Sequence, residues 1–211
     1  MCVMARNLDM LNVLLNAAMI DVNVRTHEGH VPLWFALLLH PPNTYDGFAA
    51  KLIEHGASTD PQYAVSGDSL LHLVIKEGLE AAAIFLCSSG ANPNHVNQKG
   101  ESPLHIACSM GMAKLITALL RNGANPNLQT VMISQLSENF VPYRLTPLHI
   151  AVMNNHSSAV DAILEFKEHL KEGFDSKHIA PNLNLKDSLG QTPLSSALSC
   201  GFQAIVVHLI E

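Results

Sequence analysis

Charged residues are scarce in this chain of 211 residues, and their balance is negative. They make up 14% of the sequence, against about 25% in typical soluble domains. The 12 lysines and arginines are outnumbered by 18 aspartates and glutamates, which gives a formal net charge of -6. Because such a surface repels the phosphate backbone, we expect no nucleic-acid partner.

Long apolar runs are absent as well. The longest one covers residues 31–39, whereas a membrane-spanning helix needs about 20 apolar residues. The first residues of the chain also lack the apolar segment of a secretory signal. These absences predict a cytoplasmic location without direct membrane insertion.

Cysteine is rare and forms no recognisable framework. The four residues Cys2, Cys87, Cys108 and Cys200 include no Cys-x-x-Cys pair. Scattered thiols of this kind favour reduced intracellular cysteines over disulfides or thiolate zinc sites.

Motifs of enzymes and metal centres are missing too. Two histidine pairs, His27 with His30 and His169 with His178, have no cysteine or carboxylate partner at zinc-site spacing. The sequence contains no glycine-rich phosphate loop and no nucleophile elbow. We therefore predict a protein that is not an enzyme, with no catalytic residue, no metal and no cofactor.

What the sequence does contain is a tetrapeptide that recurs five times. Its copies begin at positions 31, 69, 102, 146 and 192, and the fullest ones read Ser-Pro-Leu-His and Thr-Pro-Leu-His. The pentapeptide Gly-Ala-Asn-Pro-Asn occurs at 90–94 and again at 123–127. These motifs, in phase, are typical of ankyrin repeats, which consist of two helices and a β-hairpin turn. The sequence thus predicts an all-α fold, an ankyrin-repeat solenoid.

Each part of the motif has a physical reason. Proline suits the first position of a helix because no N–H is needed there, and the preceding serine or threonine can cap the helix. The histidine, as in His105, is expected to bond to backbone and hydroxyl groups around the turn. A glycine eight residues after the proline position, as in Gly111, supplies a left-handed helix end.

The phase of the motif divides the chain into one array, which we expect to be a fragment of a longer one. The first unit is a partial repeat that holds a second helix, and the last is a truncated repeat whose final helix stays apolar to its end. The fifth unit has an enlarged hairpin at 131–144 and a long second helix at 157–171. The predicted units are 1–22, 23–60, 61–94, 95–127, 128–184 and 185–211.

A candidate partner surface lies on the first helices, at the fifth to seventh residues after the proline position. These residues are largely apolar and include methionines, which suit an adaptable peptide or helix partner. The alternative is that some of them pack between repeats. The candidate partner-binding residues are Leu38, Ile75, Lys76, Met110 and Met153, with Tyr143 and Arg144 from the enlarged hairpin.

Asparagines that close the turns are candidate modification sites. Ankyrin repeats are substrates of a 2-oxoglutarate-dependent asparaginyl hydroxylase, and Asn23, Asn94 and Asn127 each have a leucine eight residues upstream. Asn23 matches best because Asp21 precedes it by two residues. The alternative is that these asparagines serve only to stabilise their turns.

Four segments of the chain resemble the rabankyrin family in particular, namely 26–30, 98–105, 123–130 and 185–188. The resemblance implies a scaffold that is peripheral on early endosomes and acts in endocytosis, macropinocytosis and endosomal trafficking. It also implies binding to an early-endosomal Rab GTPase in its GTP state. The family binds a phosphoinositide through a FYVE domain, whose cysteines are absent here, so that property belongs to a domain outside this chain. The family's Asn-Pro-Phe motif is absent as well.

The sequence as a whole predicts a protein–protein interaction scaffold. The resemblance narrows this to the ankyrin region of an endosomal Rab effector. The alternative is a regulatory ankyrin domain of a signalling or nuclear factor.

Overall fold

The computed structural model describes residues 8–16, 20–39, 47–63, 65–131, 143–171 and 178–210. Over these residues the chain forms α-helices and one isolated β-bridge, between Gln62 and Ser69. None of these helices has the length and apolar character needed to span a bilayer. The helices are α1 (Leu8–Leu15), α2 (Pro32–Leu39), α3 (Phe48–Glu54), α4 (Leu70–Lys76), α5 (Glu80–Ser88), α6 (Pro103–Ser109), α7 (Ala113–Arg121), α8 (Pro147–Met153), α9 (Ser157–Lys171), α10 (Pro193–Cys200) and α11 (Gln203–Ile210).

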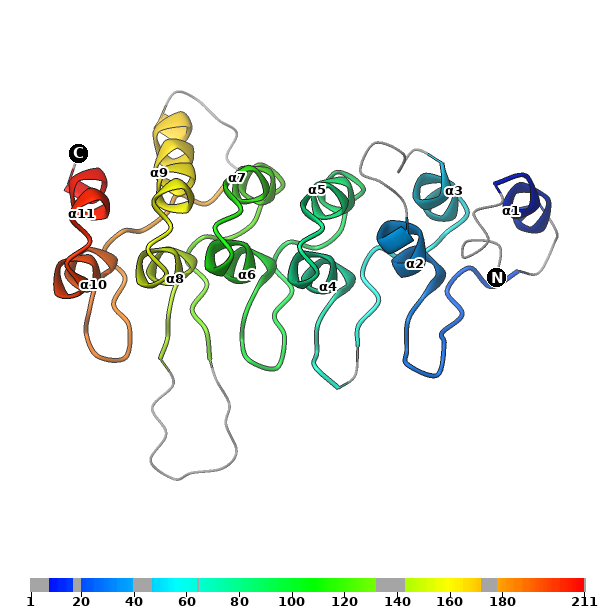
Figure 1. Ribbon diagram of the computed structural model, residues 1–211, viewed down its shortest axis with the longest axis horizontal. Helices are drawn as coiled ribbons and strands as arrows, with labels where there is room; N and C mark the ends of the chain where they lie inside the picture. Colours follow the sequence, from blue (N-terminus) through cyan, green and yellow to red (C-terminus); the bar gives the residue numbers. More distant parts are fainter. Residues whose placement is uncertain are drawn as a thin grey trace. The chain divides into compact units, whose positions relative to one another are not determined.

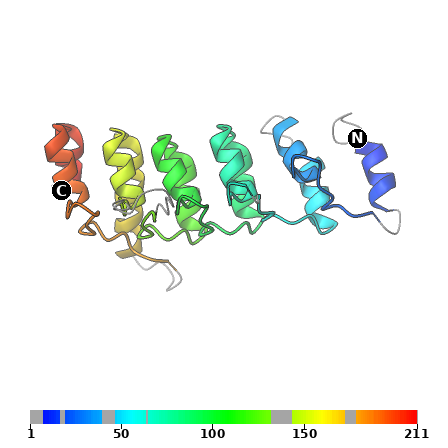
Figure 2. The ribbon, with the colours of Figure 1, turned by 90° about the horizontal axis from the view of Figure 1, so that it is seen from below.

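The chain divides into two compact units. Unit 1 comprises residues 1–65 and 69–92, and unit 2 comprises residues 66–68 and 93–211. In both units a short first helix packs against the second helix that follows it, as α4 does against α5 and α8 against α9. Within unit 2, α6, α8 and α10 form one row and α7, α9 and α11 form another (Figure 1). The helix pairs of unit 2 stand side by side in the second view as well (Figure 2).

Reciprocal hydrogen bonds fix where the first helices begin. At α8 the His149 N–H donates to Thr146 Oγ1 at 3.3 Å, and the Thr146 N–H donates to His149 Nδ1 at 3.3 Å. Ser69 with His72 and Thr192 with Ser195 form the same box. Each box pairs two backbone donors that the helix itself leaves unsatisfied, which confirms the predicted caps.

Left-handed residues fix where the first helices end. Gly78, Gly111 and Gly201 have φ angles of 74°, 68° and 73°, a region that glycine enters without a steric penalty. Asn155 takes this place after α8 with a φ of 57°, which asparagine tolerates better than most residues. The predicted helix ends are therefore confirmed.

The core of unit 2 lies between its two rows of helices. The second helix α9 has the bounds that the sequence predicts, Ser157 to Lys171. The predicted hairpin at 131–144 and the loop after α9 fall partly at 132–142 and 172–177, which lie outside the described residues. The side chains that are completely buried include Leu115, Ile116, Leu119 and Leu120 of α7 and Val160 and Ile163 of α9.

Unit 1 contains an aromatic cluster at its first hairpin. Trp34 occupies the histidine position of the repeat motif, and the His30 ring stacks on it with 5.4 Å between centroids. The Tyr63 ring lies 5.5 Å from His30. In this repeat, the packing of Trp34 against the His30 ring takes the place of the hydrogen bonds that the motif histidine makes in other repeats.

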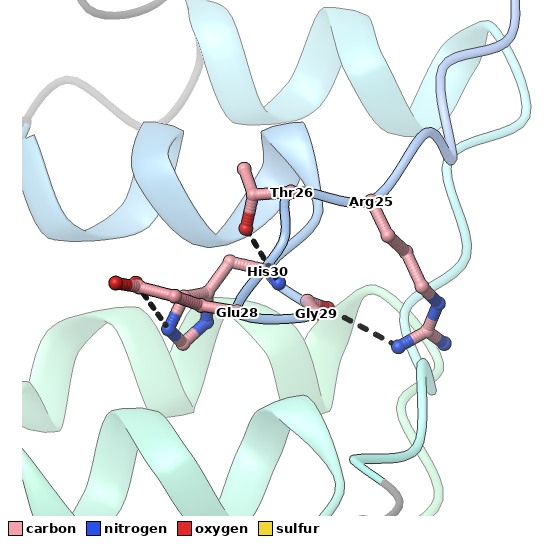
Figure 3. Close-up of polar contacts among 5 residues, drawn as sticks. All are labelled: Arg25, Thr26, Glu28, Gly29 and His30. Atoms are coloured by element: carbon pink, nitrogen blue, oxygen red, sulfur yellow. Dashed lines mark hydrogen bonds and ion pairs between the residues drawn. The ribbon is translucent and has the colours of Figure 1, made fainter.

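Arg25 forms hydrogen bonds both within the same hairpin and to the segment of unit 1 that contains Gln62. Its Nη1 donates to the Gly29 carbonyl at 3.2 Å and to the Gln62 carbonyl at 3.0 Å. The His30 N–H donates to Thr26 Oγ1 at 3.1 Å, which closes the turn (Figure 3). One arginine thus holds the turn and the following segment in a fixed relation.

Candidate protein-interaction surface

The fifth position after the proline position belongs to the core in four repeats, whereas in the last repeat Leu198 is 60% exposed. Leu37, Ile75, Cys108 and Val152 are completely buried in those four repeats. The sequence predicts Ile75 at the partner surface, but a side chain with no exposed area has none to offer a partner. The alternative, packing inside the array, is correct for this position.

Most side chains at the sixth and seventh positions are exposed instead. Met110 follows the end of α6 and Met153 ends α8, with 41% and 50% of their surface exposed. Because α6 and α8 pack against each other, both residues lie on one edge of unit 2, which we call the methionine surface. In unit 1, Leu38 is 40% exposed and Lys76 is exposed too.

The hairpin residues Tyr143 and Arg144 lie beside the hairpin of the following repeat. The Ser188 N–H donates to the Tyr143 carbonyl at 3.1 Å. The Gln129 side-chain amide donates to the Arg144 carbonyl at 3.0 Å and to the Lys186 carbonyl at 2.9 Å. Arg144 Nη2 in turn donates to Gln129 Oε1 at 3.0 Å. Sequence reasoning missed Gln129, whose two partners are brought to it only by the fold.

The asparagines proposed as modification sites share one structural role. Each donates from its side-chain amide to a carbonyl of the next repeat, and each accepts, on its side-chain oxygen, a backbone N–H two residues beyond that carbonyl. We call such a pair of bonds a rung. The rungs join Asn23 to Gly56 and Ser58 at 3.0 and 2.7 Å, Asn94 to Gly123 and Asn125 at 2.8 and 2.7 Å, and Asn127 to Ala180 and Asn182 at 2.9 and 2.8 Å.

Asp60 stands where the other repeats have the asparagine. Its carboxylate accepts the Asn92 N–H at 2.9 Å on one oxygen and 3.1 Å on the other. A carboxylate has no hydrogen to donate, so this rung of unit 1 has the accepting half alone. The donor that Asn23 and Asn94 supply to the next carbonyl is missing here.

The motif histidines are structural groups with a defined tautomer. His105 Nδ1 accepts the Ser102 N–H at 3.1 Å, and its Nε2 lies 3.1 Å from the carbonyls of Leu128 and Leu145. Since Nδ1 accepts, the ring proton is on Nε2, where it donates to the next hairpin. These contacts confirm the predicted bonding around the turn.

Two of the described thiols, Cys87 and Cys108, are buried. Burial raises the pKa of the Cys87 thiol to about 12 and also raises the pKa of Cys108, so both stay protonated and unreactive. In the part of the chain that the structure describes, no group of three or more histidine, cysteine or acidic residues could hold a metal ion. The arrangement can present side chains to a partner protein.

Family models for ankyrin repeats match two parts of the chain. A model of three ankyrin repeat copies matches residues 43–130, and a single-repeat model matches residues 143–172. An ankyrin repeat domain from Acinetobacter baumannii AYE has a similar structure, with a TM-score of 0.75 and 21% identity, over 99% of this chain and 94% of that chain. This likeness confirms the all-α ankyrin-repeat fold.

Curated relatives extend the similarity along the sequence. Rabankyrin-5 of Mus musculus is 36% identical over 99% of this chain, and Rabankyrin-5 of Homo sapiens is 35% identical over 99%. The chain spans about a fifth of the length of either relative, 20% in each case. The similarity is thus to the ankyrin region of these proteins and not to their full length.

Proposed function

This chain belongs to the ankyrin-repeat family, whose fold is a protein-interaction module, and on that premise we propose that it is the ankyrin region of an endosomal Rab effector. Its role would be that of a scaffold in endocytosis, macropinocytosis and endosomal trafficking, peripheral on early endosomes. Phosphoinositide binding would come from a domain outside this chain. The observation that carries the proposal is the identity of 35–36% to Rabankyrin-5 along nearly the whole chain.

The methionine surface is the part of unit 2 that we assign to the partner. Met110, directly after α6, and Met153, at the end of α8, are exposed, while the position-five residues of these two helices are buried. Methionine side chains are flexible and polarisable, which lets them adapt to the surface of a folded partner such as a GTPase. In unit 1, Lys76 and Leu38 are the candidate partner-binding residues.

Capture of an early-endosomal Rab GTPase on beads carrying this chain tests the proposal. The GTP-loaded GTPase should be retained and the GDP-loaded form should not, since an effector binds the active state. Equal retention of both forms, or retention of neither, overturns it.

A charge variant tests the assigned surface in the same assay. Met110→Glu with Met153→Glu should lower capture by at least about tenfold, because a partner would then bury two unpaired carboxylates. The melting temperature should stay unchanged, because both side chains are exposed. Lys114→Glu, at an exposed position of α7, changes the net charge by the same amount and should leave capture intact. Full capture by the methionine variant would remove this surface from the binding site.

We also propose that Asn23 is hydroxylated, with Asn94 and Asn127 as weaker sites. The enzyme class would insert one oxygen of O2 into a carbon–hydrogen bond of the asparagine, while 2-oxoglutarate takes the other oxygen and leaves as succinate and CO2. Asn23 and Asn94 are exposed, but their rungs must open before either segment enters an active site. Mass spectrometry after incubation with the hydroxylase should show one added oxygen on the Asn23 peptide first. An unmodified Asn23 peptide beside a modified control protein disproves the proposal.

A further inference from the structure

Three basic side chains lie on the hairpins of successive repeats in unit 2. Lys99, Arg144 and Lys186 are all exposed. Within the described residues, no carboxylate forms an ion pair with any of them. This local positive charge contrasts with the net charge of -6 of the chain.

The fold brings the last two of these hairpins together. The Gln129 side chain binds the carbonyls of both Arg144 and Lys186, and the Ser188 N–H donates to the Tyr143 carbonyl. These bonds connect segments that are distant in the sequence, since Gln129 and Lys186 are 57 residues apart. Arg144 and Lys186 are therefore held on one continuous surface.

The hairpin that carries Lys99 touches the same surface. A Cβ atom added to Gly100 would collide with the backbone nitrogen of Val131, so the two hairpins are in direct backbone contact. The Thr130 N–H donates to the Leu145 carbonyl at 2.9 Å, which connects Val131 to the arm that holds Arg144. The three cations thus follow one another across adjacent hairpins.

Neighbouring carboxylates are bonded within the turns. Asp187 Oδ1 accepts the N–H groups of Leu189 and Gln191, both at 2.8 Å. Glu101 Oε2 accepts the Asn97 side-chain amide at 3.1 Å. The acids next to Lys186 and Lys99 in the sequence are therefore engaged by the turns themselves.

Arg144 adopts a conformation that costs energy. Its φ is 48°, in the left-handed region that disfavours residues other than glycine, asparagine and aspartate by roughly 1–2 kcal/mol. The reciprocal bonds with Gln129 hold both its backbone carbonyl and its guanidinium. Strained residues that are held in place in this way are found at ligand-binding sites more often than elsewhere.

We propose that the surface made of Lys99, Arg144, Lys186 and Tyr143 binds an extended acidic peptide segment of a partner protein. We call it the basic hairpin surface. The proposal rests on the proposed function only in treating the chain as a protein-binding module. Tyr143, which is 50% exposed, adds apolar contact area next to the charges, as is common at protein interfaces.

The spacing of the hairpins sets the spacing of the acids. Packed helices lie about 8–10 Å apart, and successive hairpins follow successive helix pairs. An extended peptide rises about 3.3 Å per residue, so carboxylates at every third residue match the cations. A membrane is a poorer fit, since recognition of anionic lipid uses clusters of about 4–8 basic residues.

A fluorescent peptide of about 12 residues, with glutamate at every third position in a glycine and serine background, tests the proposal. Fluorescence anisotropy at about 0.05 M salt should show binding, and about 0.5 M salt should weaken it by screening. The same peptide with glutamine should not bind. Lys99→Gln with Lys186→Gln should weaken binding by at least about tenfold, or 1.4 kcal/mol.

Matched variants separate a binding role from a structural one. Lys114→Gln with Lys167→Gln, on α7 and α9, removes the same charge and should leave peptide binding unchanged. Arg144→Gly removes the guanidinium and relieves the left-handed backbone, so it should weaken binding without lowering the melting temperature. A purely structural arginine would lower the melting temperature instead.

Several results would overturn the proposal. The proposal is wrong if the glutamate peptide does not bind. It is also wrong if the control variant, Lys114→Gln with Lys167→Gln, weakens binding equally, or if the variant with Lys99→Gln and Lys186→Gln binds the peptide as the unchanged chain does. Binding to phosphatidylserine vesicles in preference to the peptide would assign the surface to lipid. If the peptide fails while GTP-dependent Rab capture persists, this inference alone is wrong. Met110→Ala with Met153→Ala should bind the peptide like the unchanged chain.

Discussion

His149 joins two repeats only while its imidazole is neutral. Its Nδ1 accepts the Thr146 N–H, and its Nε2 donates to the Gln191 carbonyl at 3.0 Å. Burial lowers the pKa of His149 from its ordinary value of 6.5, against smaller opposing effects of the Gln191 bond and Asp187. A proton on Nδ1 would remove the acceptor that the Thr146 N–H needs.

Acid should therefore weaken the fold through His149. Because the folded pKa is lowered, the stabilisation is fully present above the unfolded value of about 6.5 and is lost as the pH falls below it. Urea unfolding at about pH 7.5 and about pH 5.5 should give a lower free energy of unfolding at the acidic pH. His149→Ser copies the Thr192–Ser195 box and should reduce that pH dependence. An identical pH dependence in the variant would contradict the assignment.

Asp60 offers a second test at the residue scale. Asp60→Asn should complete the rung by donating to the carbonyl of the next turn, as Asn94 does. We expect a gain of about 0.5–1.5 kcal/mol in the free energy of unfolding, the usual net value of one such hydrogen bond.

The reverse exchange is the matched control for that gain. Asn94→Asp removes the donor to the Gly123 carbonyl and should lower the free energy of unfolding by a similar amount. If Asp60→Asn and Asn94→Asp shift the urea midpoint in the same direction, the rung hydrogen bond does not determine the change in stability.

At the scale of helices, α7 depends on the burial of Leu119. Leu119→Ala should lower the free energy of unfolding by about 2–5 kcal/mol, because it removes buried apolar surface and leaves a cavity. Leu189→Ala makes the same chemical change at a side chain that is 73% exposed, and it should change stability by less than about 0.5 kcal/mol. Equal effects in urea melts would show that Leu119 is not a core residue.

The helices could be predicted because each signal is local to one repeat. Capping residues, the proline position and the glycine ends all lie within a few residues of the feature that they determine, and the bounds of α9 follow from its own sequence. The burial of Ile75 could not be predicted from local sequence signals of this kind. Ile75 and Lys76 are neighbours on one apolar helix end, and the packing of adjacent repeats decides which of them is covered.

At the scale of the whole molecule, the distribution of charge on the surface is what the sequence predicts least well. The composition correctly describes an acidic chain, yet Lys99, Arg144 and Lys186 are separated by more than 40 positions each and form no basic run. Gln129 brings two of their hairpins together through hydrogen bonds across 15 and 57 residues. Tyr143 and Arg144 are predicted as partner-binding residues from the enlarged hairpin, whereas the position of Lys99 and Lys186 beside them follows only from the fold.

The rungs also decide where the chain tolerates a change of length. Asn94 reaches partners 29 and 31 residues away, while Asn127 makes the same two bonds across 53 and 55 residues. Closing a loop of twice the length costs only about 0.6 kcal/mol more, so extra residues between the ends of a rung are inexpensive. In evolutionary terms, insertions inside a repeat are tolerated, whereas loss of a rung asparagine removes two hydrogen bonds that join that repeat to the next. The same rule marks the interior of the Asn127 repeat as the place to graft a foreign loop.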